Sequence, residues 1–88
     1  MQPLKKTVAE RNDRLIERFF AALMHLKLSG KIRGIKTFTD QYNINRKSVY
    51  CIKAGVMRNL PSWWLQCLVE DYGVSATWLL TGEGPFWN

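Results

Sequence analysis

The segment from Phe38 to Ile52, FTDQYNINRKSVYCI, most constrains the fold of this chain. An amphipathic stretch up to Tyr42 is followed by a three-residue break, Asn43-Ile44-Asn45, and then by a second amphipathic stretch. The apolar positions are Phe38, Ile44, Val49 and Ile52. This spacing predicts two short helices packed at a steep angle, the second of which presents a polar and basic face.

Hydrophobic periodicity along the rest of the chain predicts an all-α fold with five helices and no strand. The expected helices are Thr7 to Leu28, Ile35 to Tyr42, Arg46 to Lys53, Ser62 to Tyr72 and Ala76 to Leu80. The first helix is less periodic before Asp13, so a later start stays open. The second helix could also begin later, because Thr37 and Asp40 have the spacing of a capping box.

Local turn signals set the ends of these helices. Asn43 is expected in the left-handed conformation that the turn requires, and Asn45 and Ser75 are expected N-caps. Pro61 suits the first turn of the fourth helix. Three glycines are expected to end helices, namely Gly55, Gly73 and Gly82.

The 88 residues make one small domain, 1–88, with a core of about 15–82 and a tail at 83–88. Periodicity predicts a core of Phe19, Leu23, Phe38, Ile44, Val49, Ile52, Leu65, Leu68, Val74, Trp78 and Leu79. Trp64 and Tyr72 are expected to fill it as well. Trp63, Phe86 and Trp87 fall off the predicted core face, which makes them candidates for a dimer interface.

The charge of the chain is unevenly distributed. Residues 27–58 carry eight Lys/Arg and one Asp, net +7, whereas residues 59–88 carry three acidic residues and no Lys or Arg, net −3. Residues 1–26 carry five Lys/Arg and three acidic residues, net +2, which brings the chain to +6. A basic band centred on the helix pair suits contact with DNA phosphates, although basic residues can also simply solvate one face.

Other classes of protein find little support in the sequence. Cys51 and Cys67 lack metal-ligand spacing, so we expect reduced thiols, no metal and no cofactor. No partner for catalysis is evident near the single His25, and no phosphate-binding glycine loop is present, so we expect no enzyme. Met1 to Arg14 is polar and no apolar run approaches the ~20 residues of a membrane span, which favours a cytoplasmic protein without a membrane partner.

Two stretches resemble the lambda-repressor-like helix-turn-helix domains, the Cro/repressor or XRE family. One is the helix pair, in which Phe38, Thr39, Asn43, Ile44, Val49 and Ile52 stand at matching offsets. The other is LVEDYGVSATWLLTGEGP, Leu68 to Pro85, which is similar to the end of this domain in repressors of phages and mobile elements. The resemblance covers about Leu15 to Pro85. It implies a five-helix DNA-binding domain.

The chain departs from the family pattern at three positions. The family usually has Ala at Thr39, Gly at Asn43, and often Gln at Ile35, where that Gln touches a phosphate. Here Ile35 is followed by Lys36, so this contact must change. The loop before Ile35 is also longer and more basic than the commonest form.

The resemblance implies which residues read bases. By position these are Asn45, Arg46, Lys47 and Tyr50; Cys51 also falls in the set but is chemically poor for the role. Arg46 or Lys47 can donate to guanine O6 and N7, and Asn45 can pair with adenine. Alternatively, Asn45 only caps its helix and Tyr50 only packs locally.

The resemblance also implies phosphate contacts at the start of the second helix and after the third. These are Lys36, Thr37, Ser48, Lys53, Arg58 and Asn59, and Lys31 and Arg33 are close enough in sequence to reach a flanking phosphate. Family members usually bind pseudo-palindromic double-stranded operators as homodimers. Each of these residues could instead be an ordinary surface group.

The expected function is therefore a sequence-specific transcriptional regulator, most simply a repressor, that reads the major groove with residues 46–53. Three alternatives stay open: an antitoxin-type autoregulator that also binds a protein partner, a recombination accessory factor, and a DNA-independent interaction module. The basic band argues against the last.

Overall fold

Residues 8–88, which the computed structural model describes, fold into five α-helices. They are α1 (Val8–Leu28), α2 (Ile35–Gln41), α3 (Arg46–Lys53), α4 (Ser62–Tyr72) and α5 (Ala76–Thr81). The all-α prediction is confirmed, and the predicted bounds agree to within one residue. The predicted start at Thr7 lies outside the described residues. Over the same range, an isolated β-bridge between Val74 and Trp87 takes the place of any strand.

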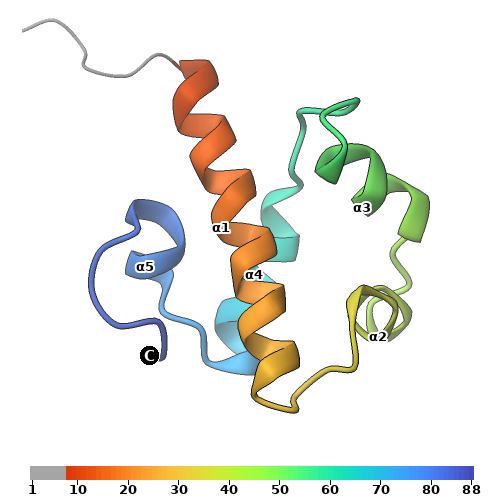
Figure 1. Cartoon of the computed structure of the whole chain (residues 1–88). Coiled ribbons are helices and arrows are strands. Elements are labelled where there is room, and N and C mark those ends of the chain that lie inside the picture. The colour runs from red at the N-terminus through yellow and green to blue at the C-terminus, as the bar shows by residue number, and fades with distance from the viewer. Residues whose placement is uncertain (1–7) are drawn as a thin grey trace, which may run out of the picture.

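Helix α1 is the axis of the fold. Figure 1 shows α5 on one side of α1, α2 and α3 on the other, and α4 crossing behind it. Phe19, Leu23 and Leu26 lie at spacings of three and four on α1 and are buried. This stripe lets one long helix serve as the packing surface for the others.

The core joins all five helices. The rings of Phe38 and Trp64 lie 5.9 and 5.8 Å from that of Phe19, measured between centroids. Every residue of the predicted core is buried except Ile44 and Trp78, which pack against it partly exposed. Of the two further aromatics expected there, Trp64 is buried and Tyr72 is partly buried.

The turn between α2 and α3 forms as its sequence predicts. Asn43 has a φ of 54°, in the left-handed region. The buried Thr39 hydroxyl donates to the Lys36 carbonyl at 3.0 Å, and the Thr39 carbonyl accepts from Ile44 N at 2.8 Å. The extra hydroxyl at this helix contact is therefore satisfied within α2.

The capping box expected at Thr37 and Asp40 is wrong. Helix α2 begins at Ile35 after Gly34, which makes no side-chain cap, so Thr37 already lies inside the helix. The Thr37 hydroxyl accepts from Arg33 N at 3.2 Å instead, and Asp40 pairs with Lys36.

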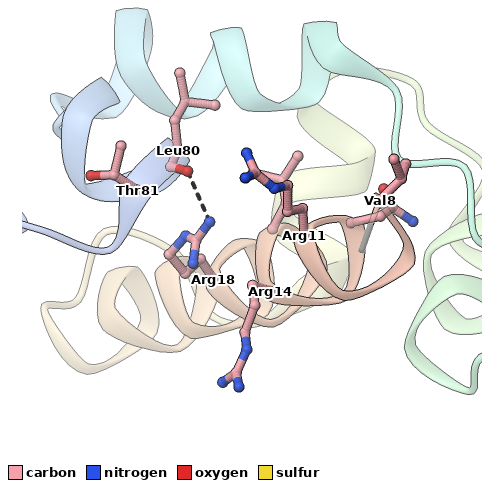
Figure 2. Close-up of a pocket in the computed structure, with 8 residues that line it drawn as sticks. Val8, Arg11, Arg14, Arg18, Leu80 and Thr81 are labelled. Carbon is pink, nitrogen blue, oxygen red and sulfur yellow. Dashed lines mark hydrogen bonds between the residues drawn. The ribbon is translucent and has the colours of Figure 1, made fainter. Parts of the chain in front are cut away.

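Arg18 fixes α5 to α1. Its Nε donates to the Leu79 carbonyl at 2.7 Å and its Nη2 to the Leu80 carbonyl at 2.9 Å. Figure 2 shows this side chain reaching from α1 to the end of α5. Carbonyls in the last turn of a helix lack intrahelical partners, so an arginine there both satisfies them and offsets the negative end of the helix dipole.

The residues after α5 are not a free tail. Ser75 N donates to the Phe86 carbonyl at 2.7 Å and Asn88 N to the Gly73 carbonyl at 2.8 Å. The Phe86 ring stacks on His25, with centroids 4.1 Å apart, and meets Trp78 edge-on. The prediction that Phe86 falls off the core face is therefore wrong, because these backbone bonds fold its ring back onto α1 and α5.

Two tyrosine hydroxyls join α2 to α4. Tyr42 donates to Asp71 Oδ2 at 2.6 Å, and Tyr72 donates to Gln41 Oε1. Burial, followed by the bond to Asp71, raises the pKa of Tyr42 well above its ordinary value of about 10. Burial and the nearby Asp71 carboxylate also raise the pKa of Tyr72.

This bond predicts a stability that declines at alkaline pH. Folded Tyr42 holds its proton more tightly than unfolded Tyr42, so its contribution is complete below about pH 10 and is lost as the pH rises from there towards the folded pKa. We expect Tyr42→Phe to lower the free energy of unfolding at neutral pH by about 0.5–1.5 kcal/mol and to flatten the alkaline decline. Urea denaturation across this range measures both, with Tyr50→Phe on α3 as the control. An alkaline slope equal to that of the wild type would contradict the assignment.

Candidate nucleic-acid interface

Helix α3 separates its apolar and basic residues by face. Val49 and Ile52 are buried, whereas Arg46, Tyr50 and Lys53 are exposed. The exposed three lie at i, i+4 and i+7, so they form one strip along the outer side of the helix. Lys47 is exposed beside the strip, and α3 contains no acidic residue.

Asn45 caps α3. Its Oδ1 accepts from Lys47 N at 2.9 Å, so the cap expected from the sequence is present. The side chain is exposed, and its amide nitrogen is the group that can still donate outward. Capping and base contact thus use different atoms of the same side chain.

Three of the predicted residues line one hollow of about 640 Å³ between α1, α2 and α3. Lys36 comes from the first turn of α2, and Tyr50 and Lys53 come from α3. Lys27, from the last turn of α1, lines the same hollow and was not among the predicted site residues. The signal for it was its place four residues after Leu23, on a stripe that we considered only as core.

Other predicted phosphate contacts already have partners within the chain. Lys36 Nζ lies 2.8 Å from Asp40 Oδ2, and both side chains are mostly exposed. Arg58 forms an ion pair with Asp13 of α1, and its carbonyl accepts from Asn12 Nδ2 at 2.7 Å. Exposed pairs of this kind are worth little and exchange readily, so Lys36 keeps its reach towards solvent, while Arg58 is held towards α1.

The remaining predicted contacts differ in exposure. Asn59 is exposed in the loop after α3, Ser48 is partly buried, and Thr37 is partly buried with its hydroxyl accepting from Arg33 N. In the loop before α2, the Lys31 ammonium lies over the ring of Trp87, 5.2 Å from its centroid. The geometry therefore groups Asn45, Arg46, Lys47, Tyr50, Lys53 and Lys36 more closely than it groups the rest.

The candidate dimer residues fall into two groups. Trp63, in the first turn of α4, is 46% exposed, and Trp87 is 39% exposed. Phe86 is packed against His25 and Trp78 within the chain. Trp63 and Trp87 are thus the aromatic surfaces still open to a partner.

Within residues 8–88, no group of His, Cys, Asp or Glu is arranged to hold a metal ion. Both cysteines of the chain are free thiols, and burial raises the pKa of Cys67. None of the described helices combines the length and apolar character that crossing a membrane requires.

No family model, curated protein or solved structure matches this chain.

Proposed function

We propose that this protein is a sequence-specific transcriptional regulator of the repressor type, which reads double-stranded DNA by placing α3 in the major groove. The observation that carries the proposal is the division of α3 into a buried apolar face and an exposed strip of Arg46, Tyr50 and Lys53, flanked by Asn45 and Lys47. An α-helix with its side chains is about 10–12 Å wide, which matches the ~12 Å major groove.

The distribution of charge supports the same proposal. Residues 27–58, which include α2 and α3, carry net +7, and the part of the chain after them carries net −3. A basic band on one side of a small domain attracts the phosphate backbone and orients the protein on it. Lys36 and Lys53, at the edges of the α3 strip, suit this role because phosphates flank the groove on both sides.

The resemblance to lambda-repressor-like domains is independent support, since it rests on two separate segments. The observed left-handed Asn43 and the Asn45 cap are the local features that a helix-turn-helix needs between its two helices. The segment Leu68 to Pro85 contains α5 and its Ser75 cap.

We expect the regulator to act as a homodimer on a pseudo-palindromic operator, with the two half-sites about 34 Å apart. Sedimentation at rising protein concentration tests this, with Trp63→Ser and Trp87→Ser as separate variants. Truncating the end of the chain would also remove the bonds from Ser75 and Asn88, so single substitutions are more informative. A wild-type mass that stays monomeric, with and without operator DNA, would contradict the dimer.

Selection from a pool of random duplexes tests the function. We expect repeated rounds to enrich one motif with twofold symmetry, and the enriched duplex to bind at least about 10³-fold more tightly than a scrambled duplex. Enrichment of no motif, together with weak binding to every duplex, would mean that the basic band serves only unspecific contact.

A further inference from the structure

The hollow between α1, α2 and α3 has an apolar wall. Phe20, Leu23 and Met24 line it from α1, and Ile35 lines it from α2. Leu23 is buried, but Met24 is 54% exposed, which leaves apolar surface open to solvent inside a concave site. With a volume of about 640 Å³, the hollow lies within the ~300–1,000 Å³ that small-molecule sites usually span.

Around this wall stand three ammonium groups and one hydroxyl. They belong to Lys27, Lys36, Lys53 and Tyr50, which come from three different helices. No acidic side chain lines the hollow, since the carboxylate of Asp40 meets Lys36 outside it. The site therefore combines positive charge with an apolar surface.

We propose that this hollow binds a small amphipathic organic anion: an aromatic or short aliphatic body that carries a carboxylate, sulfonate or phosphate group. The body covers the Met24 and Phe20 surface, and the anionic group lies among the three lysines. A bare inorganic anion would use only the lysines and leave the apolar wall in water, so both parts of the ligand contribute.

The position of the hollow gives the ligand a regulatory effect, a consequence that rests on the proposed function. Lys36, Tyr50 and Lys53 also belong to the candidate nucleic-acid interface, so a bound anion occupies side chains that DNA needs. A ligand that excludes DNA releases the operator, because two ligands that use the same groups cannot bind together. The anion acts as an inducer.

Fluorescence titration with 8-anilinonaphthalene-1-sulfonate, an aromatic sulfonate, tests binding to the full chain. We expect saturable binding at one site per chain. Met24→Glu places a carboxylate among the lysines and is expected to weaken binding by about tenfold or more, and Lys27→Gln by about two- to fivefold. The matched controls are Leu28→Glu, also apolar, exposed and on α1, and Lys31→Gln, another lysine of the basic band.

A second basic hollow provides the contrast. It lies between α1 and α5, with Arg11 and Arg14 in its lining (Figure 2), so Arg11→Gln removes a positive charge there. Equal effects of Met24→Glu and Leu28→Glu would overturn the proposal, as would loss of binding in Arg11→Gln alone. Inorganic phosphate that displaces the probe as effectively as naphthalene sulfonate does would also overturn it, because the apolar wall would then contribute nothing.

A second arm separates this inference from the proposed function. Naphthalene sulfonate added to the wild-type complex with the selected duplex is expected to release the DNA, and the Met24→Glu complex is expected to resist it. If the probe binds but the DNA stays bound, the inducer role fails. If the protein binds no DNA, the proposed function fails, and the titration alone still decides whether the site exists.

Discussion

Replacing Phe19 with Ala is expected to lower the free energy of unfolding by about 3–5 kcal/mol. Phe19 is fully buried on α1, and its ring meets those of Phe20, Phe38 and Trp64. The substitution removes contacts to α2 and α4 together and leaves a cavity that rigid helices fill poorly. A chain of this size has only about 4–13 kcal/mol of stability, so the variant should be largely unfolded at body temperature.

Urea denaturation followed by circular dichroism measures this loss. Leu28→Ala is the matched control, because Leu28 lies on the same helix and is 80% exposed. We expect the control to change stability by less than about 0.5 kcal/mol. A Phe19→Ala variant as stable as the control would show that α1 is not the centre of the core.

Replacing Arg46 and Lys53 with Ala is expected to separate two kinds of DNA contact. Arg46→Ala should lower binding to the selected operator by about 1–3 kcal/mol, while binding to scrambled duplex falls much less, because a lost base contact removes sequence preference. Lys53→Ala should weaken both duplexes alike and flatten the salt dependence by about one unit, because a lost phosphate contact carries no sequence information.

Titrations of both variants on both duplexes at several salt concentrations measure these effects. Arg46 and Lys53 are exposed, so neither change should disturb the fold, and Lys31→Ala controls for the loss of one positive charge elsewhere in the basic band. An equal loss on both duplexes for Arg46→Ala would remove its base-reading role. A loss for Lys53→Ala on the operator alone would reverse the two assignments.

The helices were predictable because their signals are local. Asn43 adopts the left-handed turn, Asn45 and Ser75 cap α3 and α5, and Gly73 and Gly82 end helices in the left-handed conformation. The contacts that were missed join distant segments. Arg18 meets Leu79 and Leu80, and Ser75 meets the Phe86 carbonyl, in ways that no local pattern encodes.

The candidate site was predictable to the same extent. The outward strip of α3 follows from the burial of Val49 and Ile52, which their spacing predicts. That Arg58 would pair with Asp13, and that Lys27 would share a hollow with Lys53, depends on how α1 lies against α3. Such pairings come from tertiary packing, so helical periodicity alone could not identify them.

The most direct test of the central claim is the affinity of the wild-type protein for selected and scrambled duplexes, measured by fluorescence anisotropy as salt is varied. The account predicts a large preference for the selected duplex and a logarithm of affinity that falls linearly with the logarithm of salt concentration on both. Equal affinity for the two duplexes, or binding that salt does not change, would contradict it.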